Sequence, residues 1–90
     1  MILCIGEILA DMIGEAAGVD GAPVFKMFCG GAPFNVAVNA KQSGAKVAFI
    51  GRVGRDPVGK FLIDYSNKVG FDYLDIQRDE VRNTTLALVT

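Results

Sequence analysis

Short apolar runs, separated by turns rich in glycine and proline, recur along the first third of the chain. Ile2–Ile5 is a continuous apolar run closed by a glycine, which predicts a short, fully buried first strand. The segments Glu7–Glu15 and Pro23–Phe28 are apolar-rich with scattered polar residues, and the turn-forming stretch AAGVDGA lies between them. This arrangement predicts two antiparallel strands joined by a loop.

Two helices are predicted further along, each bounded by its own signals. Pro33 suits a first helical turn, the stretch Phe34–Ser43 has no breaker, and Gly44 suits a helix C-terminus. Asp56 and Pro57 form an N-cap and first-turn pair for the second helix. Five apolar residues of this helix share one stripe: Val58, Phe61, Leu62, Tyr65 and Val69. The stripe is expected to face the core.

The remaining segments complete an α/β pattern. Lys46–Ile50 predicts a second buried strand, Phe71–Ile76 a third, and Thr84–Thr90 a last one, which follows the polar turn QRDEVRN. Strand, helix and strand in this order imply a parallel sheet. Hydrophobic residues make up 51% of the 90 residues and charged residues 21%, so the chain should bury a core. So apolar a composition in so short a chain indicates that a partner chain or the rest of a larger domain completes it.

Composition argues against several classes of function. A formal charge of −1 leaves no basic excess for binding nucleic acid, and the absence of histidine excludes an imidazole base and a histidine-ligated metal. Cys4 and Cys29 lie in apolar runs, which favours core residues over a disulfide or a metal pair. The apolar runs are too short to cross a membrane, and a chain that begins at Met1 without a targeting signal is expected to be cytoplasmic.

The first candidate site lies at the predicted start of the first helix. Gly30 and Gly31 let a ligand approach the main chain closely, and the helix N-terminus adds free N–H donors. Asn35, in the first turn, offers an amide donor and an acceptor, which suits hydroxyl groups better than phosphate. The alternative is a glycine turn ahead of a buried helix, with Asn35 as a local cap.

Asp11 is the second candidate, a carboxylate among apolar neighbours on a predicted strand. Such a group is either solvated on an outer face or paired with donors. In a binding site it could accept two hydrogen bonds from sugar hydroxyls, whereas on an outer face it would have no function.

A third pattern, Gly54–Lys60, fits the phosphate-binding motif G-x-x-x-x-G-K and follows a predicted strand. Residue 61 is Phe where that motif needs a hydroxyl for Mg²⁺, and Pro57 removes an amide from a loop that works by donating amides. The N-cap role explains Asp56, and solvated surface charge explains Arg52 and Arg55. A nucleotide-binding half-domain is therefore the weakest of the functional hypotheses.

Four segments, GEILADMI, GGAPFNVAVNAKQSG, AFIGRVGRDPVGKFL and NTTLALVT, resemble the N-terminal part of ribokinase-like (PfkB) carbohydrate kinases, fructokinases most of all. The resemblance covers nearly all 90 residues. It implies that residues 1–90 are the incomplete N-terminal part of a single sugar-kinase domain with a mostly parallel sheet and flanking helices. A small β-sheet lid over the sugar would take its strands from near residues 7–15 and 23–28, with 84–90 as a further candidate.

The same resemblance assigns sugar-binding roles to Asp11, Gly30, Gly31 and Asn35, and it implies a homodimer that pairs through the lid strands. It also implies phosphoryl transfer from ATP with Mg²⁺, both bound mainly outside this segment. The family's catalytic base is an Asp in a Gly-Ala-Gly-Asp-like motif, which does not occur here, so no catalytic or metal-binding residue is expected in these 90 residues.

Two readings of function follow for this sequence. The first is ATP-dependent phosphorylation of a small sugar, with fructose favoured, by the full-length protein. Arg55 and Asn83 depart from the residues usual at these positions, which leaves the choice of sugar open. The alternative is a non-catalytic sugar-binding or dimerisation module, should the natural chain end near residue 90.

Overall fold

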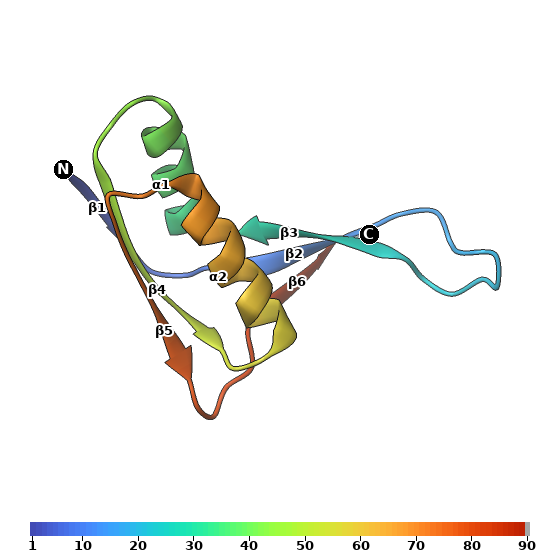
Figure 1. Ribbon diagram of the computed structural model, residues 1–90. Coiled ribbons are helices and arrows are strands. Elements are labelled where there is room, and N and C mark those ends of the chain that lie inside the picture. The colour runs from blue at the N-terminus through green and yellow to red at the C-terminus, as the bar shows by residue number, and fades with distance from the viewer. Residues whose placement is uncertain (90) are drawn as a thin grey trace.

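The computed structural model describes residues 1–89, which form two three-stranded sheets and two helices (Figure 1). The first sheet is parallel and has the order β1 (Ile2–Ile5), β4 (Val47–Gly54), β5 (Tyr73–Asp79). Helices α1 (Ala32–Gln42) and α2 (Pro57–Val69) pack against this sheet. The α/β class, the parallel sheet and both helices are therefore confirmed.

The second sheet projects away from the first and has the order β3 (Phe25–Gly30), β2 (Leu9–Gly14), β6 (Leu86–Val89) (Figure 1). Strands β2 and β3 pair antiparallel, which confirms the predicted pair, and β6 runs parallel to β2. The sequence predicted the last strand as 84–90. It is shorter in the structure, and Thr90 lies outside the described residues.

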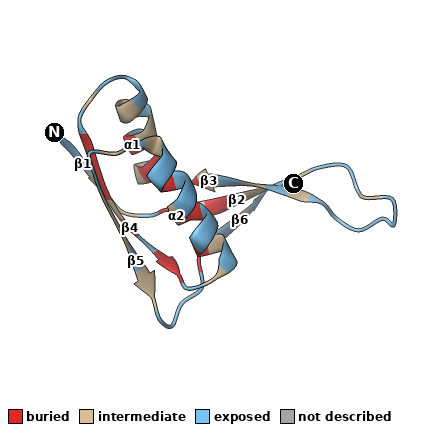
Figure 2. Ribbon diagram, in the orientation of Figure 1, coloured by how far each residue is buried: buried red, intermediate tan, exposed pale blue. Residues whose placement is uncertain are grey.

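The core lies between the first sheet and the helices, where the buried segments of Figure 2 converge. Phe34 of α1 and Phe49 of β4 are both almost fully buried and meet edge to face, with their ring centroids 5.2 Å apart. Phe71 stacks on Phe49 at 5.9 Å. Ile8 and Ala10 extend this core to the base of the second sheet, so the two sheets are joined by apolar packing at that point.

Two predictions of burial are wrong. The first strand is exposed, with Ile2 at 44%, Leu3 at 57% and Ile5 at 61%, because among residues 1–89 β1 has a neighbouring strand only at its β4 edge and a helix on only one face. Phe61 is 37% exposed, although it belongs to the apolar stripe of α2. The buried face of α2 is centred on Leu62 and includes Ser66, whose hydroxyl donates to the Leu62 carbonyl (2.7 Å).

The segment predicted as a polar turn begins inside β5. Gln77 pairs with Arg52, and Asp79 pairs with Gly54, so the strand extends three residues past the predicted end. Polar side chains are tolerated here because β5 is an edge strand of the sheet described. Arg52 donates hydrogen bonds to both Gln77 and Asp79, so its charge is paired within the sheet.

Candidate functional site

Asp11 and Gly30 come together where the second sheet meets the start of α1. The Asp11 carboxylate lies over the Cα of Gly30, so that a Cβ at position 30 would overlap Oδ2 of Asp11. Gly30 is buried and Asp11 is half-buried. The missing side chain at position 30 is therefore what makes room for the carboxylate. None of the side-chain hydrogen bonds among residues 1–89 involves Asp11, which leaves its oxygens available to outside donors.

Gly31 is the N-cap of α1 and sets the direction in which the helix leaves β3. Its φ of 103° belongs to the region that favours glycine, and a Cβ there would lie 2.5 Å from the Glu7 carbonyl oxygen. No side chain caps this helix end, so backbone N–H groups of its first turn stay free of side-chain partners. Pro33 follows within the first turn, as the sequence predicted. Gly31 thus holds an open helix N-terminus next to the Asp11 carboxylate.

Asn35 is exposed on the first turn of α1, and its backbone N–H donates to the Gly31 carbonyl (2.9 Å). The reading of Asn35 as a local cap is wrong, because the N-cap is Gly31 and no side chain bonds there. No hydrogen bond among the described residues joins its amide to Asp11. Of the four candidates, then, the structure brings Asp11 and Gly30 into contact, and places Gly31 and Asn35 on the adjacent helix start.

Asp56 has a larger role than the N-cap that the sequence predicted. It accepts from the Gly59 N–H (2.6 Å), which confirms the cap, and also from the N–H (2.8 Å) and the hydroxyl (2.7 Å) of Thr84. Thr84 Oγ1 in turn accepts from the Gly54 N–H (2.9 Å). These bonds, the Thr84 N–H first among them, hold the pKa of Asp56 below its usual value.

The Asp56–Thr84 contact fixes the segment that leads into β6, and with it one edge of the second sheet. Sequence reasoning missed this contact, since Thr84 lies 28 residues further along the chain. A signal was present in the threonine pair at the start of the last predicted strand, but a hydroxyl there also suits an ordinary strand.

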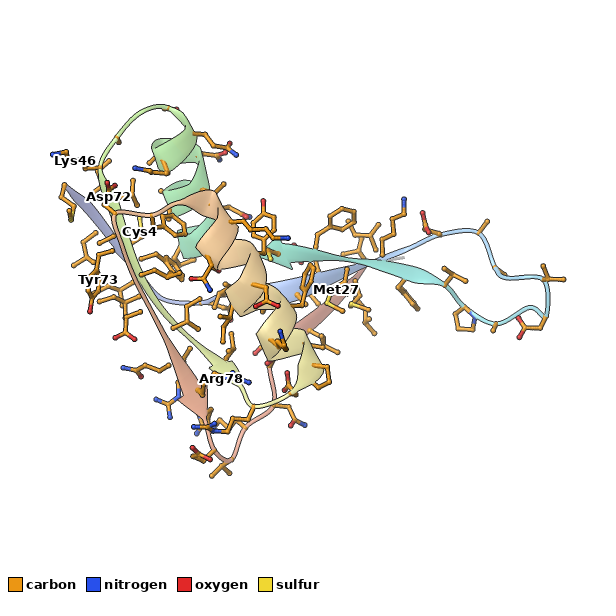
Figure 3. The ribbon with its side chains drawn as sticks, in the orientation of Figure 1. Cys4, Met27, Lys46, Asp72, Tyr73 and Arg78 are labelled. Carbon is orange, nitrogen blue, oxygen red and sulfur yellow. The ribbon has the colours of Figure 1, made fainter. Side chains whose placement is uncertain are left out.

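A second carboxylate organises the far end of β5, near the labelled Arg78 in Figure 3. Asp79 accepts from the N–H groups of Val81 (2.8 Å) and Arg82 (2.9 Å) and pairs with Arg52. The Arg82 N–H, followed by that of Val81, lowers the pKa of Asp79 to about 2. Arg55 pairs with Glu80 at the surface. Arg52 and Arg55 are thus engaged with carboxylates rather than open to an anion.

The Gly54–Lys60 loop does not have the geometry of a phosphate cradle. The N–H groups of Gly54 and Gly59 donate to Thr84 and Asp56, and the Lys60 ammonium pairs with Asp64 (2.9 Å). Within residues 1–89 no three His, Cys, Asp or Glu side chains gather as they would around a metal ion. The described residues therefore do not fit a triphosphate or Mg²⁺ in this loop.

A cleft on the described part of the chain does not contain the candidate residues. It has a volume of about 500 Å³ and lies against the first sheet between Gly6, Glu7, Arg52, Gln77 and Thr85. The two cysteines pack against the core, as predicted, and burial raises the pKa of Cys29 to about 11. Along the part of the chain described, neither helix has the length and apolar character needed to span a membrane.

The sequence and the fold of this chain were compared with those of known proteins. The family model for pfkB family carbohydrate kinases matches residues 1–90. The chain belongs to this family. A probable fructokinase-7 from Arabidopsis thaliana is 40% identical over 92 aligned residues, which cover all of this chain and 27% of the relative. A 5-dehydro-2-deoxygluconokinase from Clostridium botulinum is 45% identical over 81 residues, covering 88% of this chain and 24% of that protein.

Solved structures of pfkB family members share the fold. The crystal structure of a fructokinase with bound ATP from Xylella fastidiosa superposes with a TM-score of 0.87 at 38% identity, over 97% of this chain and 28% of that one. The ribokinase-like fold expected from the resemblance is therefore confirmed. The chain spans roughly a quarter of the length of these relatives.

Proposed function

We propose that the protein phosphorylates a small sugar, with fructose favoured, and uses ATP as the phosphoryl donor. Residues 1–90 would supply part of the sugar site through Asp11, Gly30, Gly31 and Asn35. The catalytic base and most contacts to ATP and Mg²⁺ would come from residues outside this segment. The fructokinases and the dehydro-deoxygluconokinase among the relatives support a sugar substrate, and the ATP-bound fructokinase supports the donor.

One observation carries the proposal: the Asp11 carboxylate lies over Gly30 beside an uncapped helix N-terminus. A half-buried carboxylate to which no side-chain or backbone group of residues 1–89 donates is suited to accept hydrogen bonds from two vicinal hydroxyls of a sugar. The exposed Asn35 amide offers a donor and an acceptor one helical turn further on. Together these groups would fix the orientation of the sugar, and orienting the reacting hydroxyl is the main contribution a kinase site makes before transfer.

The activity is tested by release of ADP from the complete natural protein in a coupled assay. Fructose, ribose, glucose and 2-keto-3-deoxygluconate are each supplied with ATP and Mg²⁺. Sugar-dependent ADP release, strongest with fructose, is expected. Absence of turnover with every sugar would contradict the proposal.

The second sheet is proposed to act as the lid over the sugar and to pair two subunits. It projects from the core and exposes apolar side chains, among them Leu86 at 50% and Leu88 at 67% (Figure 2). Strands β3 and β6 form its two edges within the described residues, so each has backbone groups available for pairing. Sedimentation of the complete protein should therefore give a dimer, and Leu88→Asp should shift it towards monomer. We also propose a cytoplasmic location, with neither nucleic acid nor a membrane as partner.

A non-catalytic sugar-binding or dimerisation module is the alternative function, favoured by the exposed apolar side chains of β1, which a partner chain would cover. The intact mass of the protein from its source distinguishes the two. A mass near the 9.6 kDa of this chain would favour the module, and a mass several times larger would favour the kinase.

A further inference from the structure

The register of the second sheet places an aromatic ring beside the candidate sugar-binding carboxylate. Asp11 of β2 and Phe28 of β3 are directly opposite each other in the antiparallel pair. Side chains of opposite residues emerge on the same face, with Cβ atoms about 5 Å apart. Phe28 and Asp11 therefore share one face of the sheet, and Gly30, two residues along β3, lies on that face as well.

This face points away from the core. Met27 and Cys29, which flank Phe28 in sequence and so lie on the opposite face, pack against the core cluster. Figure 3 labels Met27 on the second sheet, near α2. Phe28, by contrast, is 47% exposed. The ring is therefore not held in place by core packing, and its energetic contribution to folding is correspondingly small.

The side chains directly beside Asp11 on this face are apolar, whereas Lys26, which is opposite Ile13 on the same face, pairs with Glu15 (3.4 Å). Ile13, the next residue of β2 on this side, is 42% exposed, and Ala87 of β6 lies opposite Asp11 at its other edge. The Asp11 carboxylate is thus flanked directly by apolar side chains, one of them the phenyl ring of Phe28, with the Lys26–Glu15 pair further along the sheet. Sugars present hydroxyl edges and C–H faces, and such a surface offers a partner to each: hydrogen-bond acceptance from the carboxylate and apolar contact from the ring.

We propose that Phe28 is a specificity-determining residue of the sugar site, in which its ring packs against the C–H face of a sugar whose hydroxyls are bound by Asp11. The inference rests on the proposed kinase function and deepens it, because it assigns a contact that selects among sugars. A sugar with an uninterrupted C–H face towards the ring is favoured. A sugar that presents a hydroxyl to the ring is disfavoured, because that hydroxyl gives up its hydrogen bonds to water and finds no partner on the apolar surface.

The test compares Phe28→Ala, Phe28→Leu and Phe28→Tyr in the complete natural protein, with Phe61→Ala as the matched control. Phe61 is also a partly exposed phenylalanine, but it lies on α2 and outside the candidate site. The coupled assay gives kcat and KM for fructose and for the other sugars, sedimentation gives the oligomeric state, and circular dichroism confirms that each variant is folded.

Phe28→Ala is expected to raise KM for the preferred sugar about tenfold with kcat little changed, and to reduce the preference among sugars. Phe28→Tyr should retain the wild-type KM, and Phe28→Leu should fall between, because it keeps an apolar surface without the ring. Equal KM values for Phe28→Ala and Phe61→Ala would overturn the inference. A Phe28→Ala protein whose oligomeric state changes while its KM values stay those of the wild type would overturn it as well. Should Phe28→Ala not fold, the Leu and Tyr variants decide in the same way. Failure of the proposed function is distinct, because the wild-type protein itself would then turn over no sugar.

Discussion

Removal of the Asp56 carboxylate is expected to destabilise the fold more than the loss of a partly exposed side chain usually does. Asp56→Ala deletes the acceptor for the Gly59 N–H at the start of α2 and for the N–H and hydroxyl of Thr84. Loss of an N-cap costs about 1 kcal/mol. Each bond to Thr84 contributes about 1 kcal/mol more, so we expect the free energy of unfolding to fall by roughly 3 kcal/mol.

The assay is urea unfolding of the complete natural protein, followed by circular dichroism at pH 7. Asp64→Ala is the matched control, because Asp64 lies on the same helix and, within residues 1–89, its side chain pairs only with the exposed Lys60 at i−4. Such a pair contributes about 0.3–0.5 kcal/mol. The loss of unfolding free energy in Asp56→Asn should lie between the losses in Asp56→Ala and Asp64→Ala, since an amide oxygen can keep part of the hydrogen bonding without the charge.

The dependence on pH provides a second readout for the same carboxylate. The folded-state pKa of Asp56 is depressed, so its stabilisation is present above the unfolded pKa of about 3.9 and is lost as the pH falls through the folded pKa. The stability gap between wild type and Asp56→Ala should therefore narrow below about pH 4. The reasoning is refuted if Asp56→Ala and Asp64→Ala destabilise the protein equally at pH 7.

Three further predictions concern the glycines and the acid limb. Gly30→Ala should keep the thermal midpoint of unfolding but raise the KM for the sugar more than tenfold, because the new Cβ displaces the movable Asp11 carboxylate. An unchanged KM would contradict this prediction. Gly31→Ala should lower the free energy of unfolding by roughly 3 kcal/mol, because the new Cβ meets the Glu7 backbone and the φ of residue 31 is positive. Urea unfolding measures this loss, and a loss below about 1 kcal/mol would count against the prediction. Hydrogen bonds lower the pKa of Asp79 to about 2, so its contribution to the stability of the fold is present above about pH 4 and is lost towards pH 2. The thermal midpoint of Asp79→Asn should therefore depend less on pH in that interval than the midpoint of the wild type.

Much of the fold could be predicted because its signals are local. The Asp56-Pro57 pair and the glycines after each helix mark helix ends whatever the rest of the chain does, and both helices were found within a few residues. Strand pairing in the hairpin followed from one turn-rich segment. The exposure of β1 and Phe61 could not be predicted, because burial depends on which elements lie beside a residue and not on its own pattern.

The candidate site divides in the same way. Asp11 and the glycine pair stand out in the sequence by residue type. That any side chain at position 30 would overlap Asp11 depends on the register of β2 and β3. The position of Phe28 opposite Asp11 depends on strand register, and the contact of Thr84 with Asp56 spans 28 residues, which the threonine pair in the sequence does not indicate by itself. Positions defined by pairing across strands are therefore the ones that only the structure could supply.

The central claim is that Asp11 binds the sugar that this protein phosphorylates. The most direct measurement is sugar-dependent ADP release by the complete natural protein, compared among wild type, Asp11→Asn and Asp11→Ala, with the sugar-independent ATPase rate as an internal reference. The account predicts turnover by wild type and a loss of at least about a hundredfold in kcat/KM for Asp11→Ala, with Asp11→Asn in between and folding intact. Wild-type kcat/KM in a correctly folded Asp11→Ala would contradict it.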